Sequence, residues 1–299
     1  MLKKHAVLLI LSGGTFMSFV GLYMRLLSQA DGFQILFFRS LSLCLIVLMV
    51  CCLRRKVTPL IFLKSIDKND FLIGSSLSLA FVCYVFAMLY TSVASTLLIL
   101  SSTPFIAAII GWLWINERPR SITWIAMAFA IVGIYFMVRS GYQLGNSFGN
   151  LLALLSGFWF ALMLVMARHV RKNDILGGTF VGGAICIFIG AIMALLFGTG
   201  LKVTTQDLLI ILGMGAFGIG IGITLVTWGA SHVPAAEVSI LVLIESVLGP
   251  VWPWLFLNEA MTLSEILGGT LVLGSVVVFA IFSIRTETDT AKLIRNSSH

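Results

Sequence analysis

Long apolar stretches, separated by short polar or charged segments, make up almost the whole chain. They fall at about residues 6–27, 33–53, 70–91, 94–115, 121–139, 148–168, 175–198, 207–230, 235–257 and 264–284. A helix that crosses the hydrocarbon core of a membrane needs about 20 apolar residues. Each stretch has about that length. The pattern therefore predicts an all-α membrane protein with ten transmembrane helices.

The segments between the stretches carry turn residues or clustered charge, such as Asp31-Gly32 and residues 54–56 (RRK). Such segments favour chain reversal. The tightest junction lies between Thr91 and Ala94, where two predicted spans must meet. The apolar length on its two sides is too great for one span.

Lysine and arginine are distributed unevenly between the two sides that this topology creates. With the N-terminus inside, 15 of the 19 fall on the inner side, three on the outer side, and Arg39 lies within the second stretch. Cytoplasmic segments of membrane proteins carry an excess of these residues. We therefore expect both termini, including a tail at 286–299, to be cytoplasmic. Topology also explains the formal net charge of +7 without a nucleic-acid partner.

The composition agrees with a chain that lies in lipid. Charged residues make up 10% of the chain and hydrophobic residues 59%, with a mean hydropathy of +1.08, whereas a soluble domain has about 25% charged residues. The five cysteines lie in apolar stretches without CxxC spacing, and the four histidines lie at helix ends or termini. We therefore expect no disulfide framework, metal, cofactor or enzyme activity.

The chain repeats parts of itself. Residues 154–157 (LLSG) echo 10–13 (ILSG), and the Trp254 to Glu259 segment echoes Trp112 to Glu117. These matches divide the chain into a first repeat at 1–142 and a second at 146–285. Each repeat holds five predicted spans, an odd number, so the two must insert in opposite orientations. Many secondary transporters are built from inverted repeats.

Several residues in this order resemble the EamA-type branch of the drug/metabolite transporter superfamily. They are Arg39, Pro104, Glu117, Trp159 with Ala161, and Glu259. The chain departs from the family pattern in span one, where Thr15 replaces a tryptophan, and in span nine, where Ser246 follows Glu245 and the proline is displaced to Pro250. The resemblance implies a fold of two five-helix repeats. It also implies export or uptake of amino acids, nucleotide-like metabolites or drugs.

Glu245 is the strongest candidate for a functional residue, because it lies about ten residues into a predicted span. An acidic residue at the membrane centre costs on the order of 2.5–3.5 kcal/mol, so it should face the interior of the bundle. There it would bind a substrate amine or take up a proton. The alternative is a protonated side chain that serves only helix packing. Gly249 shares its helix face and would let another group approach.

Other candidates lie in the middle of predicted spans. Thr103, with Ser102, occupies the position in the first repeat that matches the Glu245 region of the second. Trp159 and Tyr84 would form an aromatic wall, although ordinary core packing explains them equally well. Arg39 would bind a substrate carboxylate or pair with Glu245, or its side chain would extend to the outer interface.

Two further features have structural interpretations. Glu117 and Glu259, at membrane boundaries, are more typical of capping or of salt bridges between the repeats than of transport chemistry. Gly213, Gly215 and Gly218 match a dinucleotide-binding fingerprint. No strand precedes them, so they indicate close helix packing.

Together these observations predict a secondary transporter in the plasma membrane, the inner membrane of a bacterium. It would move an amino acid or a related amine-bearing metabolite by alternating access, with proton coupling as a hypothesis. The alternatives are uptake or exchange of a nucleotide-like metabolite such as S-adenosylmethionine, and a channel or non-transporting membrane subunit. The expected partners are a small-molecule substrate and the lipid bilayer, and a homodimer is compatible with the sequence.

Overall fold

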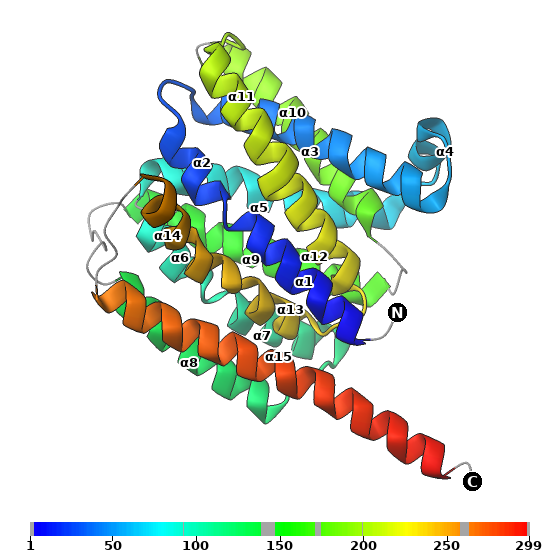
Figure 1. Cartoon of the computed structure of the whole chain (residues 1–299). Helices are drawn as coiled ribbons and strands as arrows, with labels where there is room; N and C mark the ends of the chain where they lie inside the picture. Colours follow the sequence, from blue (N-terminus) through cyan, green and yellow to red (C-terminus); the bar gives the residue numbers. More distant parts are fainter. Residues whose placement is uncertain are drawn as a thin grey trace.

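The computed structural model describes residues 3–91, 93–138, 147–170, 175–198, 200–257 and 263–297. These residues form a helical bundle and include no β-strand (Figure 1). Within these ranges, seven helical segments are long and apolar enough to cross a membrane, and three shorter apolar helices accompany them. The chain is therefore a multi-pass membrane protein.

The first half of the chain supplies eight of the labelled helices. They are α1 (Lys3–Met17), α2 (Val20–Leu26), α3 (Gly32–Arg55), α4 (Pro59–Lys64), α5 (Lys68–Tyr90), α6 (Val93–Leu100), α7 (Thr103–Ile115) and α8 (Ser121–Val138). The second half supplies α9 (Ser147–Val170), α10 (Leu176–Leu196), α11 (Thr205–Gly213), the π-helical η1 (Met214–Ile221), α12 (Gly222–Ala230), α13 (Ala235–Val242), α14 (Ile244–Leu257) and α15 (Leu263–Ser297).

Polar side chains fix where the long helices begin. Asp31 accepts hydrogen bonds from the backbone of Phe33 and Gln34, and the Gln34 side chain accepts one from the Asp31 backbone. Asp67 and Asp70 make the same reciprocal arrangement at the start of α5. These capping boxes satisfy backbone donors that have no partner within the helix. The predicted turn at Asp31-Gly32 and the tight junction after Tyr90 are both present.

Three of the predicted continuous spans are divided into two helices, and a fourth contains a π-helical segment. The first divides into α1 and α2 at Ser18 and Phe19, the fourth into α6 and α7 at Ser101 and Ser102, and the ninth into α13 and α14 at Leu243. The eighth is continuous from Thr205 to Ala230 but contains η1. Pro104 contributes to the break in the fourth, because proline fits the first turn of a new helix and disrupts the interior of an old one.

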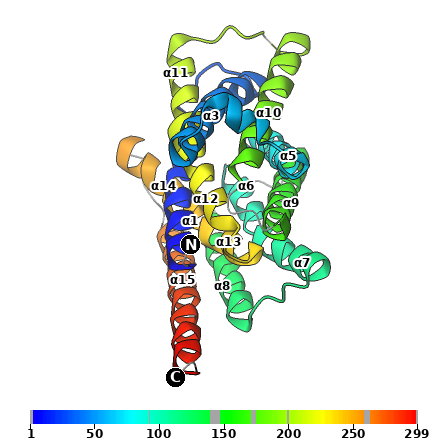
Figure 2. The ribbon, with the colours of Figure 1, turned by 90° about the vertical axis from the view of Figure 1, so that its right-hand side faces the viewer.

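Close helix pairs build the bundle. The helix α3 packs along α10, and α8 along α15; α5 packs on α9 and α1 on α12 (Figures 1 and 2). Glycines permit the closest approaches: a Cβ at Gly13 would lie 2.6 Å from the Gly222 carbonyl oxygen. Gly215 would likewise clash with Ser42 and with the Arg39 backbone. The glycine-rich segment therefore serves helix packing, as predicted.

The outer surface is apolar. Leu45 is 60% exposed, Phe188 70% and Leu195 67%. A soluble monomer rarely exposes so much contiguous apolar area, but lipid solvates it readily. The exposure pattern thus agrees with the assignment as a membrane protein.

Candidate functional site

A central cavity lies where the interrupted helices meet. Its wall comes from α1 and α2, α5, α6 and α7, α9, η1, and α13 and α14, which belong to predicted spans one, three, four, six, eight and nine. The lining residues are Met17, Val20, Ala80, Phe81, Tyr84, Leu97, Leu100, Thr103, Ser156, Phe160, Ile219, Ser239, Val242, Leu243, Glu245 and Ser246. The breaks in α6/α7 and α13/α14 both reach this space. Helix breaks at membrane depth are tolerated where the irregular backbone is buried in protein or lines a cavity.

The cavity is small and mostly apolar. Its volume is about 90 Å³. One water needs at least about 10–15 Å³, so the cavity has room for several waters or for the compact part of a small molecule. A few polar groups in an apolar wall are typical of sites that orient a ligand.

Glu245 and Tyr84 face each other across the cavity. The Tyr84 hydroxyl donates a hydrogen bond of 3.5 Å to Glu245 Oε1. Glu245 lies in the first turn of α14, where the partial positive charge of the helix N-terminus favours a carboxylate. Its side chain is half-buried. The cavity thus presents one acidic group beside an aromatic ring, an arrangement suited to a cationic or protonated amine.

Thr103 also lines the cavity, at the start of α7. Its buried hydroxyl has no hydrogen-bond partner. Gly157 packs against it, because a Cβ there would lie 2.9 Å from the Thr103 oxygen. Ser102 instead donates its hydroxyl to the Ile99 carbonyl at 2.7 Å and is not part of the wall. The Thr103 hydroxyl is therefore a buried polar group beside the cavity whose hydrogen-bonding capacity the described residues leave unused.

Two predicted residues lie off the wall. Trp159 is half-buried and makes an edge-to-face contact with Phe158 at 5.3 Å, whereas the next residue, Phe160, lines the cavity. One residue along a helix turns the side chain by about 100°. Gly249 lies near Ser18, because a Cβ at Gly249 would lie 4.0 Å from the Ser18 carbonyl oxygen. Trp252 caps that break by donating a 2.7 Å hydrogen bond from Nε1 to the Ser18 hydroxyl.

Arg39 lies behind the wall. It is 1% exposed, so its side chain does not extend to the interface, and that alternative is wrong. Its guanidinium carbon lies 5.0 Å from the centre of the Phe81 ring, and Phe81 separates it from the cavity. Around it, Gly215 of η1 packs directly on the Arg39 backbone, and Gly183 of α10 packs on Leu43 and Cys44 of α3.

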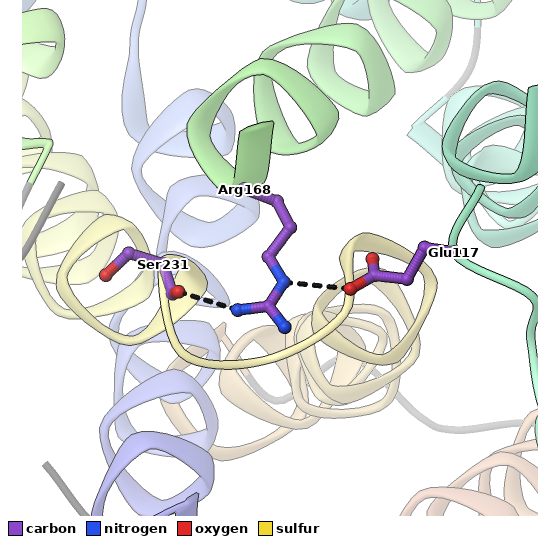
Figure 3. A network of polar contacts seen from close by, with 3 residues as sticks. All are labelled: Glu117, Arg168 and Ser231. Atoms are coloured by element: carbon purple, nitrogen blue, oxygen red, sulfur yellow. Dashed lines mark hydrogen bonds and ion pairs between the residues drawn. The ribbon is translucent and has the colours of Figure 1, made fainter. Parts of the chain in front are cut away.

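One end of the bundle is held together by a polar cluster. Arg168 Nε donates to Glu117 Oε1 at 2.9 Å and Nη1 donates to the Ser231 carbonyl at 2.9 Å (Figure 3). The cluster joins α9 to the segment after α7 and to the loop before α13. The predicted salt bridge between the two sequence repeats is thus present at Glu117, and Glu259 lies outside the described residues. A second, polar cavity of about 210 Å³ lies beside it, between α7, the start of α8 and α13.

Residues that the sequence analysis did not select include Ser156, Ser239 and Ser246 in the wall. Each carries a hydroxyl group within an apolar span, which could have marked it as a candidate. Small hydroxyl side chains are common in packed membrane helices, however, so this feature does not single out site residues. No group of three or more metal-ligating side chains occurs in the described ranges.

Comparisons with known proteins agree with this architecture. A model of the EamA-like transporter family matches residues 4–139 and 147–281. An uncharacterized transporter of Archaeoglobus fulgidus is 26% identical over 225 residues, which cover 74% of this chain and 71% of the relative. One from Methanothermobacter thermautotrophicus is 24% identical over 226 residues, 71% of this chain and 65% of the relative.

A solved crystal structure shares the fold. Its TM-score is 0.79 over 94% of this chain and 98% of the other, at 16% sequence identity. At that identity the likeness concerns the fold alone.

Proposed function

Because this chain belongs to the EamA-like transporter family, we propose that it is a secondary transporter that moves a small amine-bearing metabolite, such as an amino acid, across the plasma membrane by alternating access. The observation that carries the proposal is the central cavity, which both Glu245 and Thr103 line, each beside a helix break.

Helix packing supports ten spans in two repeats related by a two-fold axis, and five spans in each repeat would make the two repeats inverted. If the repeats are related by a two-fold axis, each contact should recur when every helix is exchanged for its equivalent. The pair α5 and α9 then becomes α12 and α1, and both pairs pack closely. The pair α10 and α5 becomes α3 and the η1 segment, and these also pack together. Two further pairs consist of a helix and its own equivalent in the other repeat, so the exchange leaves them unchanged. These pairs, α3 with α10 and α8 with α15, also pack closely.

The cavity lies where such a transporter needs its site. Discontinuous helices at the interface between repeats commonly form substrate and ion sites near the membrane midplane. Here the α6/α7 break comes from one repeat and the α13/α14 break from the other. A substrate ammonium would pair with Glu245, and the rings of Phe81, Tyr84 and Phe160 would cover its apolar part.

The Arg168 cluster supports a state that is closed at the cytoplasmic end. With both termini inside, the Arg168, Glu117 and Ser231 contacts lie on the cytoplasmic side. Alternating access then requires them to break when the two repeats rock apart. The second cavity would form the entrance on this side.

Reconstituted liposomes test the proposal. With the chain as purified, we expect saturable uptake of labelled amino acids that is stimulated by substrate on the opposite side. Glu245→Gln should reduce it by at least about tenfold, because a charged hydrogen bond contributes about 1.5–3 kcal/mol. Tyr84→Phe, which keeps the ring and removes the hydroxyl, should reduce it less.

The pH dependence tests proton coupling. If Glu245 carries the proton, an imposed pH gradient should drive uptake in the wild type and not in Glu245→Gln. Equal transport by both proteins at every pH would exclude a role for this carboxylate. Non-saturable flux without counterflow would indicate a channel. Counterflow that occurs only with nucleotide-like substrates would indicate a transporter of nucleotide-like metabolites.

A further inference from the structure

Arg39 is enclosed on every side by helices. Phe81 of α5 covers the face of its guanidinium, and Cys186 of α10 and Tyr84 of α5 lie within electrostatic range. Gly215 of η1 packs directly against the Arg39 backbone, since a Cβ there would clash with it. The side chain is 1% exposed. Neither bulk water nor lipid headgroups reach this charge.

The buried charge has no counter-charge among the described residues. Arg39 makes no ion pair there, and its Nη2 atom is buried without a hydrogen-bond partner. Glu245, the acidic residue of the cavity, is instead hydrogen-bonded to Tyr84. Burying a single ion costs several kcal/mol even after relaxation. A cation–π contact stabilises a cation by about 0.5–2 kcal/mol. The contact with Phe81 is therefore too weak to offset the cost of burying the Arg39 charge.

A second polar atom at the same place also lacks a partner. The hydroxyl of Ser40, the next residue of α3, is buried without a hydrogen bond. On the α10 side, a Cβ at Gly183 would lie 3.7 Å from the Ser40 carbonyl oxygen, and the Cys186 thiol donates to the Ser78 carbonyl of α5 at 3.7 Å. The guanidinium and the hydroxyl thus belong to adjacent residues of α3 in the layer where α5 and α10 pack on it. Unsatisfied donors so close together in a low-dielectric interior form an environment that favours an anion.

We propose that Arg39 Nη2 and the Ser40 hydroxyl bind one small monovalent anion, either a halide or a carboxylate group. The anion reaches them from the central cavity when the Phe81 side chain rotates. The anion gives Arg39 the counter-charge that the surrounding helices do not supply.

Thermal unfolding of the purified full-length chain in detergent tests this site and needs no transport. At constant ionic strength, replacing gluconate by chloride should raise the midpoint in a saturable way, by roughly 3–5 °C. Arg39→Gln should abolish the rise. Arg54→Gln is the matched control, because Arg54 lies on the same helix in a cation–π contact with Trp228 and should keep the full response.

Two further arms identify the anion. If acetate and glycine raise the midpoint and chloride does not, the bound group is a carboxylate, supplied by substrate; if chloride does, it is a resident halide. Should Arg39→Gln fail to fold, bromide bound to the wild type gives an anomalous diffraction peak beside Nη2. A midpoint indifferent to halides and carboxylates alike, or no bromide peak after a chloride response, overturns the proposal. If the protein responds to anions but does not transport amino acids, the anion site is supported and only the proposed transport function is excluded.

Discussion

Single side chains hold the irregular parts of this bundle in place. Asp207 is fully buried near the start of α11. Its carboxylate accepts hydrogen bonds from the backbone of Ser28, Gln29 and Ala30, and from the Ser28 hydroxyl, at 2.9–3.3 Å. One acidic group thus satisfies the donors of the whole turn between α2 and α3, which belongs to the other sequence repeat.

Removing the Asp207 carboxylate should therefore be costly. Asp207→Ala removes the acceptor of three backbone N–H groups on a turn where Ser28 and Gln29 are exposed. Water replaces part of each lost hydrogen bond, so each loss costs about 0.5–1.5 kcal/mol. We expect the unfolding midpoint in detergent to fall by roughly 5 °C. Asp207→Asn keeps one acceptor oxygen, so its unfolding midpoint should lie between those of the wild type and Asp207→Ala. Equal midpoints for the wild type and Asp207→Ala would contradict this account.

The sequence identified some cavity residues and missed others for a physical reason. A carboxylate in the middle of an apolar span stands out, because lipid penalises it, and Glu245 does line the cavity with Tyr84. Trp159 and Phe160 are both aromatic, so polarity does not distinguish them, and the position of the break in a helix decides which one faces inwards. The Asp207 contacts join residues 177–179 positions apart and leave no local signal.

At the scale of the helices, glycine decides how closely they pack. The helix α5 meets α10 at Gly74, where a Cβ would lie 2.7 Å from the Gly178 carbonyl oxygen and 2.8 Å from the Gly182 nitrogen. Both are backbone atoms, so no side chain can rotate away. The two helices would have to separate.

Gly74→Ala tests this contact. Overpacking of a tight core costs about 1–3 kcal/mol, so the unfolding midpoint should fall by several degrees. Gly274→Ala on α15 is the control, because nothing lies within 4 Å of its Cβ position and alanine favours a helix. That substitution should leave the midpoint unchanged or raise it. A larger loss in Gly274→Ala than in Gly74→Ala would contradict the assigned packing.

Helix positions followed from the sequence, but helix breaks did not. Hydrophobic length alone located the long segments, because a membrane span must be about 20 residues. The break before Ile244 contains no proline, and Ser18 and Phe19 are unremarkable in an apolar run. These breaks depend on partners in other helices, such as Trp252 for Ser18, which a linear pattern does not reveal.

For the whole molecule, the Arg168 cluster controls one end of the bundle. Arg168→Ala removes both hydrogen bonds in Figure 3 and frees the loop before α13. Both side chains of the ion pair are about a quarter to a third exposed, so solvent screening reduces its contribution. We expect amide hydrogen exchange at residues 231–240 to accelerate about fivefold. Lys64→Ala, at an exposed lysine of α4, which packs on α3, should leave exchange there unchanged.

Faster exchange at residues 231–240 in both variants would mean that charge in general, and not the Arg168 contacts, holds this end closed. Unchanged exchange in Arg168→Ala would mean that α7 and α13 stay together through their apolar packing alone.

The burial of the thiols gives the molecule a practical property. Cys44, Cys51, Cys83 and Cys186 are buried, and Cys52 is only partly exposed. Charged maleimides react with accessible thiolates, so the native chain should be nearly inert to them. Distance-measuring probes can then be attached at single introduced cysteines without first deleting the natural ones, and the movement of the helices can be followed in the unmodified core.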